Sequence, residues 1–116
     1  MDVKQFYQEI KGNYQNAVSI MMNDALIARM LTKFMANNDY EKIISAYEAK
    51  DFQSLFAAVH AFKGVTGNLA LTPLYELSCA ITEATRNNPT PVIDQEISQL
   101  KEVYACVKSN YEKYIG

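Results

Sequence analysis

Residues 52–69 read FQSLFAAVHAFKGVTGNL, and this stretch decides the fold. Apolar residues and one threonine recur within it at alternating spacings of three and four, at Phe52, Leu55, Val59, Phe62, Thr66 and Leu69. That spacing puts all six on one stripe of an α-helix, and the stripe continues in register across Gly64 and Gly67. The stretch therefore predicts a helix that packs one face against neighbouring helices.

Helical spacing also occurs upstream of this segment. Apolar residues between positions 3 and 10 predict a short helix that ends near Gly12, followed by a linking stretch at 14–18. Asp24 can cap the next helix. We expect that helix to run from about residue 24 to 49, with a weak point at 37–39, where two asparagines and an aspartate occur together.

Two further helices are expected downstream. Thr72 as N-cap and Pro73 at the first helical position predict the start of one. Its apolar stripe would consist of Leu74, Leu77, Ile81 and Ala84, and it would end at 87–89. Residues 93–114 repeat the alternating spacing of four and three and predict the last helix.

Helices with apolar stripes and short connections pack as a bundle. No segment of useful length alternates as a strand would. We therefore predict an all-α protein: an antiparallel up-down four-helix bundle with a short extra N-terminal helix, forming one domain over residues 1–116.

Composition narrows the possible partners. The formal net charge is -2 and no Lys/Arg cluster is visible, which argues against nucleic acid as a partner. No apolar run is long enough to span a bilayer, and the N-terminus lacks a signal-peptide pattern. Cys79 and Cys106 have neither metal-type nor redox spacing, so we interpret them as reduced thiols in or near the core of a cytoplasmic protein.

His60 is the only histidine, and it lies on the side of its helix away from the apolar stripe. Phe56, Lys63, Gly64 and Gly67 are its neighbours on that face, at spacings of three, four and seven. Each glycine inside a helix costs about 1 kcal/mol relative to alanine. Two of them beside the only histidine indicate that another surface approaches closely here.

The chemistry of this face suits phosphoryl transfer. A neutral imidazole is a nucleophile near pH 7, and Lys63 could place a positive charge beside the incoming phosphoryl oxygens. The chain shows neither a glycine-rich phosphate-binding loop nor a metal-binding carboxylate cluster. It would therefore carry a phosphoryl group while a partner supplied the catalysis.

The sequence around the histidine resembles the signature of histidine-containing phosphotransfer (HPt) domains. His60-Ala61-Phe62-Lys63-Gly64, followed by Gly67-Asn68-Leu69 and Leu74, is similar to the family pattern of His-x-Leu-Lys-Gly, a small residue, Asn or Ser, and an apolar residue. Residues 47–52 also resemble the segment that precedes the family histidine.

The resemblance implies a role for each matching residue. His60 would accept the phosphoryl group on Nε2, Lys63 would stabilise the phosphohistidine, and Gly64 would leave room for it. Phe56, Ala57 and Gly67 would lie in the patch that docks a response-regulator receiver domain. Family members relay phosphoryl groups between receiver aspartates, with Mg²⁺ held by the receiver and no cofactor of their own.

Three positions depart from the family pattern. Phe62 replaces the usual leucine, Ala70 stands where many members have glycine, and Thr82 stands where a glutamate is expected after leucine. None of them is the phosphoacceptor. These departures therefore concern local geometry and the choice of partner.

Three functional hypotheses follow. The first is a phosphorelay intermediate without kinase or phosphatase activity of its own, monomeric, whose partners are receiver domains, including that of a hybrid sensor histidine kinase. The second is a receiver-binding module that takes up no phosphate. The third is a haem- or metal-binding bundle that uses His60 with one of five methionines, for which a Soret band would be the test. The start at Met1 favours a free-standing protein over an excised domain.

Overall fold

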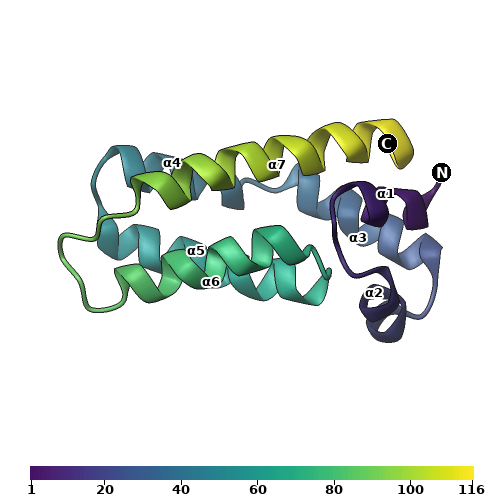
Figure 1. Ribbon diagram of the computed structural model, residues 1–116, viewed down its shortest axis with the longest axis horizontal. Helices are drawn as coiled ribbons and strands as arrows, with labels where there is room; N and C mark the ends of the chain where they lie inside the picture. The colour runs from purple at the N-terminus through teal and green to yellow at the C-terminus, as the bar shows by residue number, and fades with distance from the viewer.

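The computed structural model describes residues 1–116, and every regular element in it is a helix, as predicted. In chain order the helices are α1 (Val3–Glu9), α2 (Tyr14–Met21), α3 (Asp24–Ala36), α4 (Asp39–Glu48), α5 (Phe52–Asn68), α6 (Thr72–Thr85) and α7 (Asp94–Tyr114) (Figure 1).

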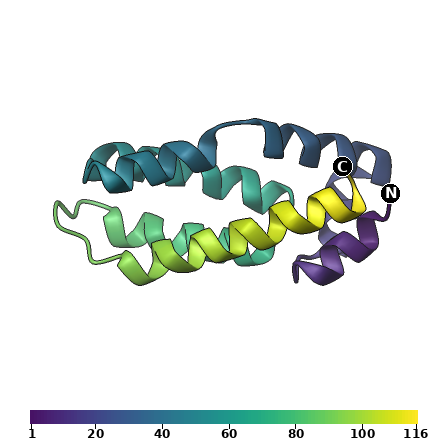
Figure 2. The same cartoon turned by 90° about the horizontal axis from the view of Figure 1, so that it is seen from above.

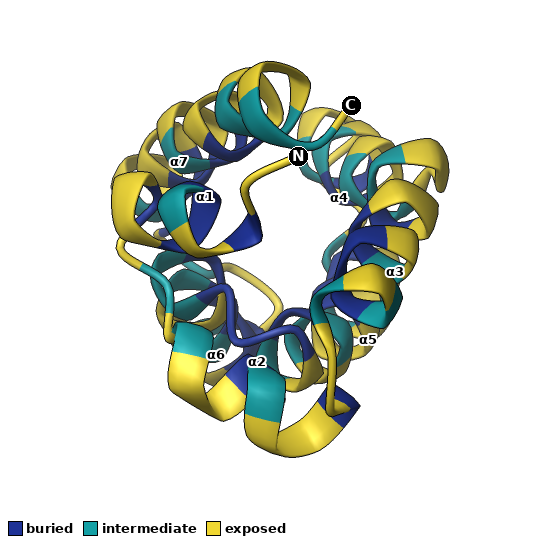
Figure 3. Ribbon diagram, turned by 90° about the vertical axis from the view of Figure 1, so that its right-hand side faces the viewer, coloured by how far each residue is buried: buried dark blue, intermediate teal, exposed yellow.

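The helices form an antiparallel four-helix bundle. α3 and α4 follow one another and together take the place of the first helix of the bundle, and α5, α6 and α7 are the other three (Figure 2). Seen down the long axis, these helices surround a common interior toward which the buried residues face (Figure 3). α1 and α2 lie at the end of the bundle that carries both chain termini (Figure 1).

Aromatic side chains pack α3 and α4 against α5 and α7. The ring of Phe34 on α3 lies 5.6 Å from that of Phe62 on α5 and 6.3 Å from that of Tyr104 on α7. Tyr40 on α4 stacks on Tyr104 with ring centroids 3.8 Å apart. Two short helices thus contribute to one core in place of one long helix.

The prediction of one continuous helix over 24–49 was wrong, because the chain breaks between α3 and α4. Asn37 adopts an extended backbone conformation there, and its side-chain oxygen accepts a hydrogen bond of 3.0 Å from the Asp39 N–H. Asparagine favours such local bonds over continuation of a helix. The weak point at 37–39 is therefore a complete break.

The N-terminal region holds two short helices where the sequence predicted one. The stretch at 14–18, expected to be a linker, belongs to α2. Asn13 caps α2 by accepting from the Asn16 N–H at 2.9 Å. Asn23, and not Asp24, caps α3 in the same way, through the Leu26 N–H at 2.8 Å.

α6 differs from its prediction in its cap and in part of its buried face. Leu71 is the N-cap, so Thr72 is already the first helical residue. Leu77 and Ala84 are only half-buried, whereas three hydroxyl-bearing residues point into the core: Ser78, Thr82 and Thr85. Each of these hydroxyls donates to the carbonyl four residues earlier, at 2.6–2.8 Å. Burial costs them little because their hydrogen bonds are made.

Both cysteines are free thiols. Cys79 is half-buried, but Cys106 is exposed, so its predicted place in or near the core was wrong. None of the seven helices combines the length and the apolar composition needed to cross a membrane.

Candidate functional site

The start of α5 is fixed by Asp51, which is its N-cap. Its carboxylate accepts from the Ser54 N–H at 3.1 Å and from the Ser54 hydroxyl at 2.7 Å. These hydrogen bonds hold the pKa of Asp51 below its usual value, because they stabilise the ionised form. The negative charge also lies at the helix N-terminus, where the helix dipole favours it.

The end of α5 is a tight turn at Ala70. This residue adopts a left-handed conformation with φ of 55°, and the Leu71 N–H bonds back to the Thr66 carbonyl at 3.0 Å. Glycine is the residue best suited to that conformation. Alanine therefore occupies a left-handed position for which glycine is the preferred residue.

His60 lies in the middle of α5 with an exposed side chain, as predicted. Its imidazole stacks on the ring of Phe56 one turn earlier, with centroids 5.9 Å apart and planes only 6° from parallel. No other side chain hydrogen-bonds to the His60 ring nitrogens, so the exposed imidazole is free to meet a partner. Ala57, on the same outward side, is also exposed.

Lys63 and Gly64 continue the same face one turn further on. Lys63 is half-buried, and the one salt bridge in the protein joins Glu83 and Arg86, so the Lys63 ammonium has no carboxylate partner. Gly64 is exposed, and a Cβ at this position would meet no atom within 4 Å. There is therefore open space beside the imidazole and an unpaired positive charge next to it.

Gly67 was expected to form part of an open outward face, but the structure gives it a packing role. A Cβ at Gly67 would lie 3.0 Å from the Tyr75 ring, which leans over it from α6. The neighbouring Cys79 thiol raises the pKa of the Tyr75 phenol. Gly67 allows the two helices to approach, and the surface at this point is that of Tyr75.

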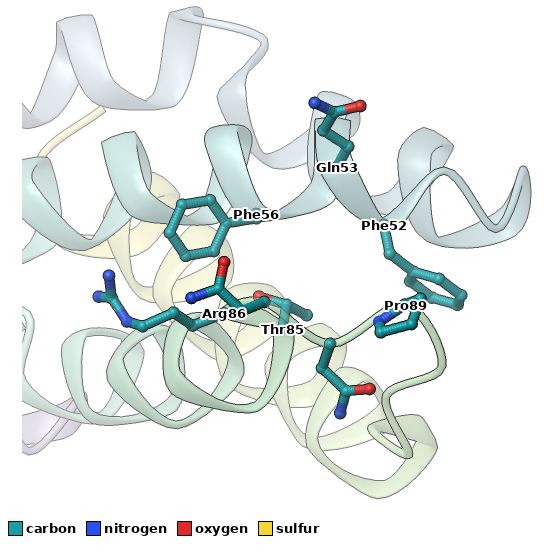
Figure 4. Close-up of a pocket in the computed structure, with 8 residues that line it drawn as sticks. Phe52, Gln53, Phe56, Thr85, Arg86 and Pro89 are labelled. Carbon is teal, nitrogen blue, oxygen red and sulfur yellow. The ribbon is translucent and has the colours of Figure 1, made fainter.

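Arg86 is a residue of this face that the sequence analysis missed. It lies at the end of α6, and its guanidinium carbon is 5.3 Å from the centre of the Phe56 ring. Phe56 and Arg86 reach the same hollow from α5 and α6 (Figure 4). An antiparallel pairing of α5 and α6 opposes residues near 86 to those near 56, and this pairing is the signal that could have located it.

A second hollow lies beyond the imidazole, on the Lys63 side. Polar residues line most of it: Lys63, Thr66 and Asn68 from α5, Thr72 and Tyr75 from α6, and Asn13 and Asn16 from the N-terminal segment. Nowhere in the protein do three or more His, Cys, Asp or Glu side chains gather as a metal site. The face thus presents one nucleophilic side chain between the hollow that Phe56 and Arg86 line and the polar hollow beside Lys63.

Comparison with known protein families identifies the family of the chain. The model of the Hpt domain family matches residues 29–109, which is well over half of the chain. The chain belongs to the Hpt domain family. The match runs from α3 into α7 and contains His60, Lys63 and Gly64, whereas α1 and α2 precede it. No curated protein and no solved structure matched the chain.

Membership in the Hpt family supports a general role as a histidine phosphocarrier that interacts with receiver domains. The helical bundle agrees with that family fold.

Proposed function

We propose that this Hpt domain is an intermediate of a two-component phosphorelay, with His60 as its phosphoacceptor. The His60 Nε2 lone pair attacks the phosphorus of a receiver aspartyl phosphate and forms a P–N bond. The P–O bond to the aspartate breaks, and the carboxylate leaves with the electron pair. The reverse steps pass the group to a second receiver.

One observation carries this proposal: an exposed imidazole lies beside open space at Gly64 and an unpaired ammonium at Lys63. A phosphoryl group attached to a helical side chain needs both room and compensation of its negative charge. Of the three oxygens that the group brings, at least one would lie within reach of the Lys63 side chain, because residues three apart are neighbours on a helix.

The partner would supply the remaining chemistry. Receiver domains provide the aspartate and hold Mg²⁺, which neutralises the charge that develops on the transferring group. The Hpt domain would then need no cofactor and no kinase activity of its own. We expect it to act as a monomer, and its two free thiols suit a reducing compartment such as the cytoplasm.

The deciding experiment is intact mass spectrometry after incubation with phosphoramidate, a small phosphoryl donor that needs no docking surface. We expect the wild-type protein to gain one acid-labile phosphoryl group and His60→Gln to gain none. Helicity and thermal stability should be the same in both proteins, because the His60 side chain is exposed.

Lys108→Gln is the matched control, since it introduces the same side chain at an exposed position on α7. It should take up phosphate as the wild type does. Wild-type protein that stays unphosphorylated by phosphoramidate and by a panel of phosphorylated receivers would contradict the proposal and favour a receiver-binding module instead.

A further inference from the structure

We propose that α2, together with the asparagine that caps it, is a partner-selecting extension of the docking surface, contacted by the receiver domain that exchanges phosphate with His60. This inference rests on the proposed phosphotransfer function and adds a specificity element to it. α2 precedes the residues that match the Hpt family model, so its contribution belongs to this chain and not to the general family pattern.

The first support is that the α1–α2 segment is fixed to the end of α5. The Tyr7 hydroxyl donates to the Leu69 carbonyl at 2.6 Å in a buried hydrogen bond, and the Asn13 N–H donates to the Ala70 carbonyl at 3.0 Å. On its other side, the Tyr14 hydroxyl donates to the Asp24 carboxylate at 2.7 Å. α2 is therefore held in one position relative to the helix that carries His60.

The second support is that α2 borders two hollows that meet on α5. Asn13 and Asn16 line the polar hollow beside Lys63. Ile20 and Met21 line a largely apolar hollow whose other walls are α3 and residues 65–69 at the end of α5 and just beyond it. Asn68 lines both. The two hollows thus meet at Asn68, and the polar one reaches the His60 face at Lys63 and Gly64.

The third support is the exposure of apolar side chains in this region. Five large apolar side chains of the protein are exposed, and three of them lie here: Ile20 at 51%, Met22 at 79% and Tyr75 at 39%. Tyr75 borders the polar hollow, and Ile20 the apolar one. Clustered exposed apolar groups rimmed by polar residues mark an interaction surface.

The distance from His60 to the two hollows indicates that the receiver domain itself occupies them. A standard interface covers about 800 Å² on each partner, which corresponds to a disc of about 16 Å radius. Asn68 follows His60 by eight residues, or about 12 Å along the helix. A receiver centred on His60 therefore covers Asn68 and meets the hollow that Asn13 and Asn16 also line, so no separate partner is needed to occupy it.

The chemistry of the surface defines what the receiver must present. An apolar side chain is expected opposite Ile20, and a hydrogen-bonding group opposite Asn13 and Asn16. If a receiver carried a charged side chain opposite Ile20, that charge would lose its hydration without gaining an oppositely charged partner. Binding of such a receiver would therefore be strongly disfavoured. α2 would in this way select among receivers that all carry the same aspartate.

The test compares Ile20→Glu with Ala105→Glu, which places the same charge at an exposed position on α7, diagonally across the bundle from α5 (Figure 3). Each variant is assayed for phosphate uptake from phosphoramidate and for binding and phosphotransfer with a panel of receiver domains. With the receiver that the wild type prefers, we expect Ile20→Glu to raise the Kd at least ten-fold and Ala105→Glu to leave it unchanged.

Both variants should take up phosphate from phosphoramidate as the wild type does, because that donor needs no docking. Equal Kd values for Ile20→Glu and the wild type across the panel would overturn the role of α2 while leaving the phosphorelay function intact. Failure of the wild type to accept phosphate from any donor would overturn the proposed function itself.

Discussion

The environment of the His60 imidazole is set by residues one turn away on either side of it. The Phe56 ring lies parallel to the imidazole, with the two ring centroids 5.9 Å apart. Gly64, with nothing within 4 Å of where a Cβ would be, leaves the next turn of the helix open. The imidazole is thus exposed beside open space, as the proposed transfer to and from a receiver domain requires.

Lys63 should prolong the lifetime of the phosphohistidine. Its ammonium is not paired with any carboxylate, so it is available to the phosphoryl oxygens. A partly exposed ion pair contributes about 0.2–1 kcal/mol, and removing it in Lys63→Ala should shorten the lifetime by up to about five-fold. The measurement is the decay of phosphorylated protein by ³¹P NMR after removal of phosphoramidate.

Lys63→Arg is the matched control, because it keeps the charge and should retain most of the lifetime. Equal lifetimes in the wild type and Lys63→Ala would remove Lys63 from this role.

Residues on a single helix were the most predictable part of the site. The positions of Phe56, His60, Lys63 and Gly64 on one face follow from helical spacing alone, and the structure confirms that they share it. The surroundings of Gly67 and the contact of Arg86 with Phe56 depend on how α6 lies against α5. Periodicity within one helix does not contain that information.

At the scale of the helix, the two glycines of α5 should respond differently to alanine. Gly64→Ala should raise the free energy of unfolding by about 1 kcal/mol, because alanine is the better helix former and its methyl group meets no neighbour. The same methyl would lie one turn from His60, so phosphotransfer from a receiver should slow. Urea unfolding followed by circular dichroism, together with a transfer assay, measures both effects.

Gly67→Ala is the comparison that tests the explanation. Its methyl would lie 3.0 Å from the Tyr75 ring, which must move to accept it. We therefore expect a smaller gain in stability than at Gly64, or a loss. A stability gain of the same size at both positions would show that packing against Tyr75 does not constrain Gly67.

Helices with a strong apolar stripe were predicted well, and their ends and interruptions were not. α5 and α7 lie within a residue of their predicted limits. The break between α3 and α4 was seen only as a weak point, because apolar spacing resumes after Asn37 and Asn38. α2 was missed because its cap, Asn13, was not recognised as one. In each case an asparagine hydrogen bond to the backbone decided the local structure.

At the scale of the whole molecule, the bundle could be predicted from four apolar stripes in the sequence. The placement of its N-terminal segment could not. Hydrogen bonds over long sequence distances tie that segment down: the Tyr7 hydroxyl to the Leu69 carbonyl, and the Asp2 N–H to the Tyr114 carbonyl. Such contacts leave no periodic signal in the sequence. They bring α2 to the hollow beside Lys63, so the least predictable part of the fold carries the proposed specificity.

Burial of Tyr104 between the helices of the bundle should make the free energy of unfolding sensitive to alkaline pH. Burial raises the pKa of Tyr104 to about 12, with further contributions from Glu41 and Tyr40. A tyrosine of the unfolded chain titrates near pH 10. Between these values the unfolded state has released a proton that the folded state keeps, so the free energy of unfolding falls as the pH rises. The contribution of Tyr104 is complete below about pH 10 and is lost on the way to pH 12.

Tyr104→Phe keeps the stack on Tyr40 without the ionisable group, so it should lose less stability than the wild type between pH 9 and 11. Urea unfolding at pH 7, 9, 10 and 11 measures this, and parallel curves for the two proteins would contradict it.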